Sequence, residues 1–242
     1  WKKFKLAKNV NARVHYDYRS KRGHATGLDI SYDFKDIGQG KLQTYIIRDS
    51  RAPDIKADEP EEHRVKDDRH RIRWQHRVDI DEYSNLLMEY NNLHDDYFLK
   101  DFFEREYHEE ARPETYAVYT RNSSRYGFLA NIEKRVGHYY TKTERLPEVR
   151  FNWNNQEIGD TNVYYKNETS IVNFNREFAH SHVDDDVFRG DFFNEFSYPF
   201  RYLRTSFLPF VNFRENYYSK NEDGKEHIMR SVFGGGIDIS TR

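Results

Sequence analysis

The sequence predicts an all-β protein of long antiparallel strands, and the evidence is residue alternation, composition and the spacing of turns. Apolar residues occupy every second position in several segments, as in Val14, Tyr16 and Tyr18, and again in Val149 and Phe151. Charged or amide residues fill the positions between them. Side chains on a strand point alternately to its two faces. Each such segment therefore has one apolar face and one polar face.

The composition favours strands over helices and over disorder. Aromatic residues make up 17% of the 242 residues, with 19 Tyr and 18 Phe, and a disordered chain would be poor in them. Tyr, Phe, Val, Ile and Thr are enriched in strands. Charged residues reach 33% against 36% hydrophobic residues, so the polar faces of the strands are rich in charge.

Charge, cysteine content and apolar runs exclude several classes of protein. The formal net charge is -2, from 39 basic and 41 acidic residues, whereas a nucleic-acid binder usually has a basic excess. The chain has no cysteine, which excludes disulfides and thiolate metal sites. No run approaches the ~20 apolar residues of a membrane-spanning helix, but a barrel strand needs only ~9–11 residues of alternating polarity. The chain begins at Trp1 without a signal peptide, which indicates an excised or processed segment.

Turn residues such as those at 20–23 and 36–40 divide the chain into about twelve strands. We expect strands near residues 10–19, 24–35, 41–50, 70–81, 83–93, 113–122, 125–136, 143–154, 161–176, 195–206, 208–218 and 226–240. The apolar residues of 97–107 recur at three- and four-residue spacing, so this segment predicts a short amphipathic helix within a connection. Residues 1–242 are expected to form one β-barrel domain segment.

The predicted connections differ in length on the two sides of the sheet. The longest ones, 51–69, 94–112 and 177–194, follow the third, fifth and ninth strands, which places all three on one side of an antiparallel meander. Outer-membrane barrels have long extracellular loops and short periplasmic turns. Aromatic pairs near strand ends, such as Tyr139-Tyr140 and Tyr217-Tyr218, suit a membrane–water boundary. The pattern predicts an antiparallel outer-membrane β-barrel or a large piece of one, with a soluble β sandwich as the alternative.

Two groups of residues resemble binding sites. Imidazole and carboxylate groups are metal ligands, so a weak metal-site candidate consists of His180, His182, Asp184, Asp185 and Asp186. Spacing alone does not make such groups converge. We therefore favour a solvated loop for this segment and expect no bound metal.

Four arginines lie opposite apolar residues and are predicted to face a polar lumen: Arg13, Arg19, Arg150 and Arg214. The guanidinium fork suits phosphate recognition, which makes them candidate ligand-binding residues. The alternative is that they pair with neighbouring acids in the barrel wall. Another charged stretch places four acids of 58–62 beside basic residues that include Arg69 and Arg71. We expect an exposed loop there, with pairs that contribute little to stability.

No catalytic site is predicted. The sequence contains no nucleophile elbow, no phosphate loop and no zinc-ligand spacing. The carboxylates are too numerous for one pair to stand out as an acid/base couple. We expect no enzymatic activity and no cofactor.

Several short stretches matter as an ordered set. They are VHYDYRSKRG from Val14, GLDISY from Gly27, NLHDDYFLKDFF from Asn92, ERLPEV from Glu144, IGDT from Ile158, YPF from Tyr198, Leu208-Pro209 and YYS from Tyr217. Their order and spacing resemble the barrel domain of the LPS-assembly protein family LptD, also called the organic solvent tolerance family, from about residue 10 to the C-terminus. The ordered set is moderately specific, especially the Arg-Leu-Pro segment before the Gly-Asp-Thr turn.

The resemblance implies a role in lipopolysaccharide transport and insertion into the outer leaflet of the bacterial outer membrane. It also implies three partners besides lipopolysaccharide: the surrounding outer-membrane lipid, an LptE-like plug lipoprotein and periplasmic LPS bridge proteins. The chain departs from the family plan because it has no jellyroll segment, no cysteines and about half the strands of a large family barrel. A fragment or a shortened relative is therefore expected. The alternatives are another porin-like outer-membrane barrel and a soluble β module that binds glycans.

Overall fold

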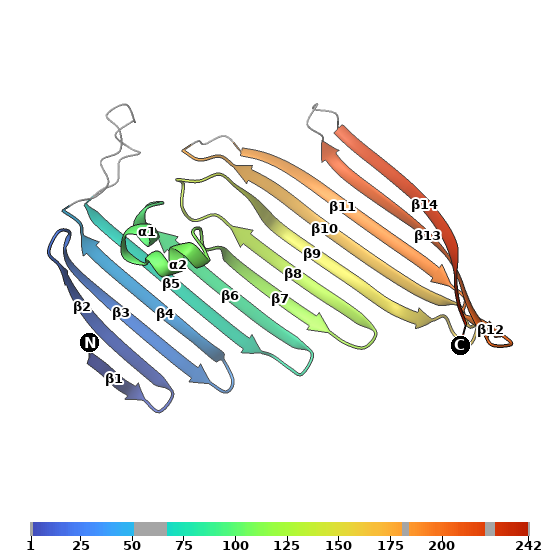
Figure 1. The fold of residues 1–242 in the computed structure, drawn as a ribbon, viewed down its shortest axis with the longest axis horizontal. Helices are drawn as coiled ribbons and strands as arrows, with labels where there is room; N and C mark the ends of the chain where they lie inside the picture. The colour runs from blue at the N-terminus through green and yellow to red at the C-terminus, as the bar shows by residue number, and fades with distance from the viewer. Residues whose placement is uncertain (1, 51–66, 181–183, 221–225, 242) are drawn as a thin grey trace.

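The computed structural model describes residues 2–50, 67–180, 184–220 and 226–241, and these form one antiparallel sheet of 14 strands. Each strand from β1 to β10 pairs with the strand that follows it in the chain, as Figure 1 shows. β11 then pairs with β13, which also pairs with β12 and β14. The prediction of an all-β antiparallel fold is confirmed. The sheet is open in the described residues, with β1 and β14 at opposite ends (Figure 1).

The elements of the first half of the sheet are β1 (Lys2–Ala7), β2 (Val10–Arg19), β3 (Gly23–Phe34), β4 (Gly38–Arg48), β5 (Asp68–Asp79) and β6 (Ser84–Leu93). The helices α1 (Phe98–Phe102) and α2 (Glu104–Glu109) follow. The second half contains β7 (Thr115–Asn122), β8 (Tyr126–Lys134), β9 (Lys142–Glu157), β10 (Tyr164–Glu177), β11 (Asp184–Ser197), β12 (Phe200–Tyr202), β13 (Thr205–Lys220) and β14 (Glu226–Thr241). No helix among the described residues is long and apolar enough to cross a membrane.

The structure corrects the strand count and one predicted connection. The described residues contain 14 strands instead of about twelve, because β1 was missed and the predicted single strand 195–206 is divided into the end of β11, the short β12 and the start of β13. The segment 177–194 is not a long loop, since β11 begins at Asp184 and pairs with β10 without a register shift. Three consecutive aspartates resemble a loop in composition, but pairing with the neighbouring strand overrides their low strand preference.

Of the other two predicted long connections, 51–69 lies mostly outside the described residues, and 94–112 falls within the connection from β6 to β7. The connections from β4 to β5 and from β6 to β7 leave the same side of the sheet, and the opposite side has short turns at 35–37, 80–83 and 123–125 (Figure 1). The predicted amphipathic helix at 97–107 is also confirmed, as the pair α1 and α2. The sheet therefore has a long-connection side and a short-turn side.

The two faces of the sheet differ in chemistry. One face, which we call the apolar face, carries a set of exposed hydrophobic side chains that includes Val14, Tyr16, Tyr18, Ile46, Ile132, Ile171, Phe188, Phe192, Phe196 and Val211. The pairing registers place these residues on a common face, because directly opposed residues of neighbouring strands project to the same side. The other face, the polar face, carries most of the charged side chains.

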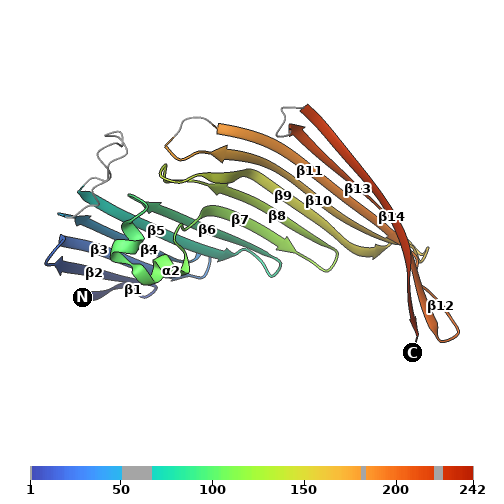
Figure 2. The same ribbon diagram turned by 45° about the horizontal axis from the view of Figure 1, so that its top comes forward.

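The hydrophobic core of the described residues lies on the polar face, beneath the helices. Its members come from β3, β4, β6 and α1, and they are Ala25, Tyr45, Ile47, Leu93, Phe98, Leu99 and Phe102. Figure 2 shows α1 and α2 lying against this end of the sheet rather than beyond its edge. The connection from β6 to β7 thus folds back over the polar face.

Candidate functional site

A row of polar side chains crosses β2 to β5 on the polar face. The registers join Arg13 to Asp29, Asp29 to Gln43 and Gln43 to Arg73. Two residues along each strand, a parallel row contains His15, Tyr45 and Arg71, with Gly27 between His15 and Tyr45. The sheet thereby brings basic, acidic and amide groups from four strands onto one surface.

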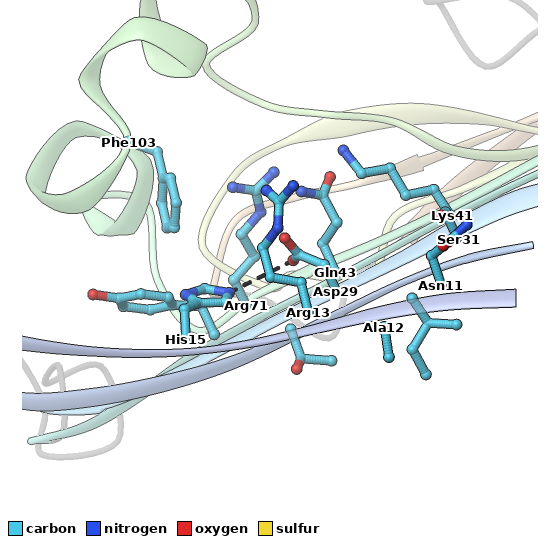
Figure 3. Close-up of a pocket in the computed structure, with 13 residues that line it drawn as sticks. Asn11, Ala12, Arg13, His15, Asp29, Ser31, Lys41, Gln43, Arg71 and Phe103 are labelled. Atoms are coloured by element: carbon cyan, nitrogen blue, oxygen red, sulfur yellow. Dashed lines mark ion pairs between the residues drawn. The ribbon is translucent and has the colours of Figure 1, made fainter. Parts of the chain in front are cut away.

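A pocket of about 410 Å³ lies over these rows, between the sheet and Phe103 at the start of α2 (Figure 3). In Figure 3 the side chains of Arg13, Gln43 and Arg71 rise from the sheet toward the same space. The full lining is Asn11, Ala12, Arg13, His15, Asp29, Ile30, Ser31, Lys41, Gln43, Thr44, Tyr45, Arg71 and Phe103. Three basic groups, one carboxylate and several amide and hydroxyl groups suit a polar ligand that carries negative charge.

The floor and the back of the pocket are held in place by local contacts. His15 Nε2 lies 3.6 Å from Asp29 Oδ1. A Cβ atom at position 27 would lie only 2.2 Å from the His15 ring, so a glycine there leaves the space that the imidazole occupies. Arg71 donates to both carboxylate oxygens of Glu106, at 3.2 and 2.5 Å, and its guanidinium lies 4.6 Å from the centre of the Phe103 ring. Helix α2 therefore orients one of the basic groups.

Behind the pocket, a buried cluster of charges surrounds Arg69, whose side chain is 0% exposed. Its Nε and Nη2 donate to the two oxygens of Asp95 at 2.8 and 2.7 Å, and its Nη1 donates to Asp49 and Asp101, both at 2.8 Å. Arg22 contacts the same Asp49 and Asp101 carboxylates at 2.8 Å. We call Arg22, Asp49, Arg69, Asp95 and Asp101 the charge cluster.

Aromatic rings of α1 pack against the cations of this region. The Phe102 ring centre lies 5.0 Å from the guanidinium of Arg69 and 5.1 Å from that of Arg22, within the range of cation–π attraction. Phe98, which is 0% exposed, lies 5.5 Å from the Arg69 guanidinium. The charge cluster and these rings together fix the β6–β7 connection on the polar face, where it forms a wall of the pocket.

The β8–β9 connection, residues 135–141, packs against the β6–β7 connection. Arg135 donates to the carbonyl groups of Tyr140 and Phe178 and to Glu177 at 2.5 Å, so it joins the 135–141 segment to the end of β10. Tyr139 packs partly against the hydrophobic core, and burial raises the pKa of its hydroxyl group above the ordinary value. Neighbouring connections thus support one another above the sheet.

The four predicted arginines all lie on the polar face, but only Arg13 lines the pocket. Arg19 donates to the Phe102 carbonyl at 3.4 Å and lies 5.0 Å from the Phe102 ring centre. Arg150 pairs with Glu148 at 2.5 Å and Arg214 pairs with Asp191 at 2.6 Å. Arg150 and Arg214 thus pair with neighbouring acids in the wall of the sheet, as the alternative interpretation expected. Ligand binding by any of the four stays a prediction.

The metal-site candidate falls partly outside the described residues, because His182 lies there. The residues that the structure describes contain no group of three or more His, Asp or Glu side chains that could hold a metal ion. The Asp185 carboxylate lies 2.6 Å from Lys220 Nζ, and Asp186 lies 3.9 Å from the same atom. A site that includes His182 stays an untested prediction.

The sequence reasoning missed the charge cluster, and the expectation of an exposed loop was wrong for Arg69 and Arg71. Both are buried, with exposures of 0% and 4%. Residues 51–66, which hold the neighbouring acids, lie outside the described residues. The alternation of Arg69 and Arg71 with His70 and Ile72 is a strand signal that could have placed both arginines on one face. Their acidic partners lie too far away in the sequence for spacing to reveal them.

The comparison with known families gives a match over most of the chain. The sequence model of the family described as "LptD: LPS transport system D" matches residues 67–232, which is more than half of the chain. The matched range includes the β5 arginines, the helices α1 and α2, and most of the second half of the sheet. A search of curated proteins found no match.

Proposed function

Because the chain belongs to the LPS transport system D family, LptD, we propose that it forms part of an outer-membrane β-barrel that transports lipopolysaccharide and inserts it into the outer leaflet. The partners in this proposal are lipopolysaccharide, outer-membrane lipid, an LptE-like plug lipoprotein and periplasmic LPS bridge proteins. The proposal assigns no catalytic step to the chain.

The arrangement of the two faces is the observation that supports a membrane barrel. Large apolar side chains such as Tyr18, at 66% exposure, and Val211, at 61%, lie uncovered on the apolar face. Exposed apolar surface that recurs on strand after strand is unfavourable in water and marks a surface that contacts another apolar phase. A barrel in lipid has apolar side chains outside and polar side chains inside, which is the pattern of this sheet.

The pocket supports a polar substrate on the inner surface. Lipopolysaccharide combines sugars with phosphate groups, and the pocket offers partners for both. Arg13, Lys41 and Arg71 supply positive charge, and Asp29 and Gln43 supply acceptor and amide groups for sugar hydroxyls. The charge cluster beside the pocket keeps the β6–β7 connection close to the same surface, which narrows the space above it.

Site-specific photo-crosslinking tests the proposal. A photoreactive phenylalanine analogue replaces Gln43, which lines the pocket, in protein purified in detergent and mixed with lipopolysaccharide. The matched control places the analogue in β3 at Leu28, on the opposite face, where detergent covers the sheet. We expect crosslinked lipopolysaccharide at position 43 and much less at position 28, with phosphorylated sugars competing better than neutral ones. Equal crosslinking at both positions, or none at position 43 in correctly folded protein, would contradict the proposal. An open ion-conducting pore in that case would favour a porin-like barrel.

A further inference from the structure

On the short-turn side, a hairpin together with the end of β14 extends beyond the end of β11. β12 pairs with the start of β13 through Tyr202 opposite Thr205, and Leu203 and Arg204 form the turn, with Leu203 at a φ of 55°. β11 ends at Ser197, opposite Phe210 of β13. The five residues 205–209 therefore extend past β11 by roughly 16 Å, at about 3.3 Å per residue. Figure 2 shows β12 and the end of β14 below the end of β11. We call residues 198–209 the projecting hairpin.

The apolar face of the sheet continues onto the projecting hairpin. Phe207 lies four residues before Val211 on β13, so both side chains point to the same face. Phe207 is opposite Phe200 of β12 on one side and Ile239 of β14 on the other. The rings of Phe200 and Phe207 stack with their centres 5.1 Å apart and an angle of 10° between their planes. These three strands form an aromatic and aliphatic surface at the end of the sheet.

This surface is not covered by any part of the chain that the structure describes. Leu203 is 81% exposed, Tyr202 68% and Ile239 62%. Phe200, although stacked on Phe207, is still 45% exposed. Turns in water normally carry small or polar residues, whereas this tip presents Tyr and Leu. The exposed apolar area therefore indicates a contact with something outside the described chain.

The charge of the projecting hairpin indicates what that contact is. Arg201 and Arg204 are exposed, and no ion pair among the described residues involves either of them. The segment 198–209 contains no acidic residue. Aromatic side chains beside unpaired arginines are the combination found at the membrane–water boundary, where rings lie at headgroup level and cations meet lipid phosphates.

We propose that the projecting hairpin docks on the phosphate-bearing headgroup surface of the lipid bilayer on the short-turn side. This inference rests on the proposed membrane barrel. A lipid surface is favoured over a protein partner because the apolar surface of the hairpin is continuous with the apolar face, so the same bilayer covers both. Tyr202 and Leu203 enter the interface and Arg204 in the turn binds headgroup phosphates, whereas Arg201 shares the opposite face with Ser206.

Tryptophan depth measurements test this inference. The full chain with Tyr202→Trp is folded into vesicles of equal parts phosphatidylcholine and phosphatidylglycerol, whose acyl chains carry bromine either near the headgroup or near the bilayer centre. After subtraction of the parent signal, we expect the new tryptophan to be quenched more by the shallow bromines than by the deep ones. The matched control is Ser206→Trp, on the opposite face of the same hairpin, which should be quenched mainly by acrylamide in the water phase.

The arginines are tested in the same background. Arg204→Gln should reduce the shallow quenching of the Tyr202→Trp protein in vesicles that contain phosphatidylglycerol, whereas Arg201→Gln, on the face of Ser206, is the matched control and should change it little. Unchanged quenching in Arg204→Gln would contradict the assignment of this arginine to lipid phosphates. Protection of position 202 from both bromines and acrylamide would show a protein contact instead, and it would overturn the proposed lipid docking.

The native tryptophans separate this inference from the proposed barrel. Trp74 and Trp153 lie on the apolar face, opposite Leu42 and Tyr126 respectively. If acyl-chain bromines quench them but do not quench position 202, the barrel stands and the hairpin inference fails. If the native tryptophans are not quenched either, the membrane barrel itself is wrong.

Discussion

Replacement of Arg69 by methionine tests whether the charge cluster holds the β6–β7 connection on the sheet. Methionine retains the length and the apolar character of the arginine stem but removes the cation. The change leaves Asp95, 6% exposed, without the two hydrogen bonds that Arg69 Nε and Nη2 donate, and it leaves Asp49, 0% exposed, with Arg22 as its cationic partner. Removal of one partner from a buried ion pair costs about 3–5 kcal/mol, because the remaining charge is left uncompensated. We therefore expect the free energy required for local opening of the β6–β7 connection to fall by about this amount.

Hydrogen exchange of backbone amides measures that opening. In α1 and α2 the Phe103 amide donates to the Leu99 carbonyl at 2.7 Å, and the Tyr107 amide donates to the Phe103 carbonyl at 3.0 Å. Each 1.4 kcal/mol corresponds to a factor of ten, so exchange at 97–110 should be faster by roughly 100- to 4,000-fold in Arg69→Met. Strands distant from the cluster, such as β13, should exchange as in the parent protein.

Arg77→Met is the matched control on the same strand and the same face. Arg77 pairs with Asp79 at 3.1 Å, but the two side chains are 52% and 63% exposed. An exposed pair contributes at most about 1 kcal/mol, so this variant should change exchange at 97–110 very little. Parent-like exchange in Arg69→Met, or equal effects of the two variants, would refute the reasoning. Arg69→Lys should give an intermediate result because lysine keeps the charge but not the bidentate geometry.

Three further predictions concern other parts of the structure. Phe98→Ala should destabilise the helix-bearing end by about 3–5 kcal/mol, because a fully buried aromatic ring is lost, and denaturant titration in detergent measures this. Asp191→Asn should lower the free energy of unfolding by about 1–3 kcal/mol in the same titration. Asp191 is 6% exposed, and its carboxylate accepts hydrogen bonds from both Nε and Nη2 of Arg214. An unchanged midpoint would contradict this. In the short turn after β5, the Tyr83 amide lowers the pKa of Asp81, so its stabilisation is present above the ordinary carboxyl pKa and is lost as pH falls through the lowered value. The protection of amides at the turn, taken relative to their intrinsic exchange rate at each pH, should therefore fall with acid in the parent protein and lose this pH dependence in Asp81→Asn.

Alternation predicted most of the sheet because the signal is local. Val14, Tyr16 and Tyr18 mark β2, whose observed bounds are those predicted, and the spacing of Phe98, Phe102 and Phe103 marks the helices. The start of β11 was missed because Asp184, Asp185 and Asp186 resemble a loop, and only pairing with β10 makes them a strand. Interactions with a neighbouring strand are not visible in a window of ten residues.

The candidate site was predicted only in part for a related reason. Alternation placed Arg13 on the polar face, where it lines the pocket. Arg69 depends on carboxylates 20, 26 and 32 residues away, and these converge only when the β6–β7 connection folds back over β4 and β5. Whether an arginine ends in an exposed pair or in a buried cluster is decided by tertiary contacts that the local pattern does not contain.

The central claim is that the apolar face meets lipid and the polar face meets water, and paired single cysteines test it most directly. The chain has no native cysteine, so each substitution gives one thiol. Ser170 and Ile171 are neighbours in β10, and their registers place them on the polar and the apolar face respectively. In vesicles, a water-soluble maleimide should label Ser170→Cys quickly and Ile171→Cys slowly, and the difference should disappear after unfolding. Equal labelling of the two cysteines in the folded protein, or faster labelling of Ile171→Cys, would contradict the account.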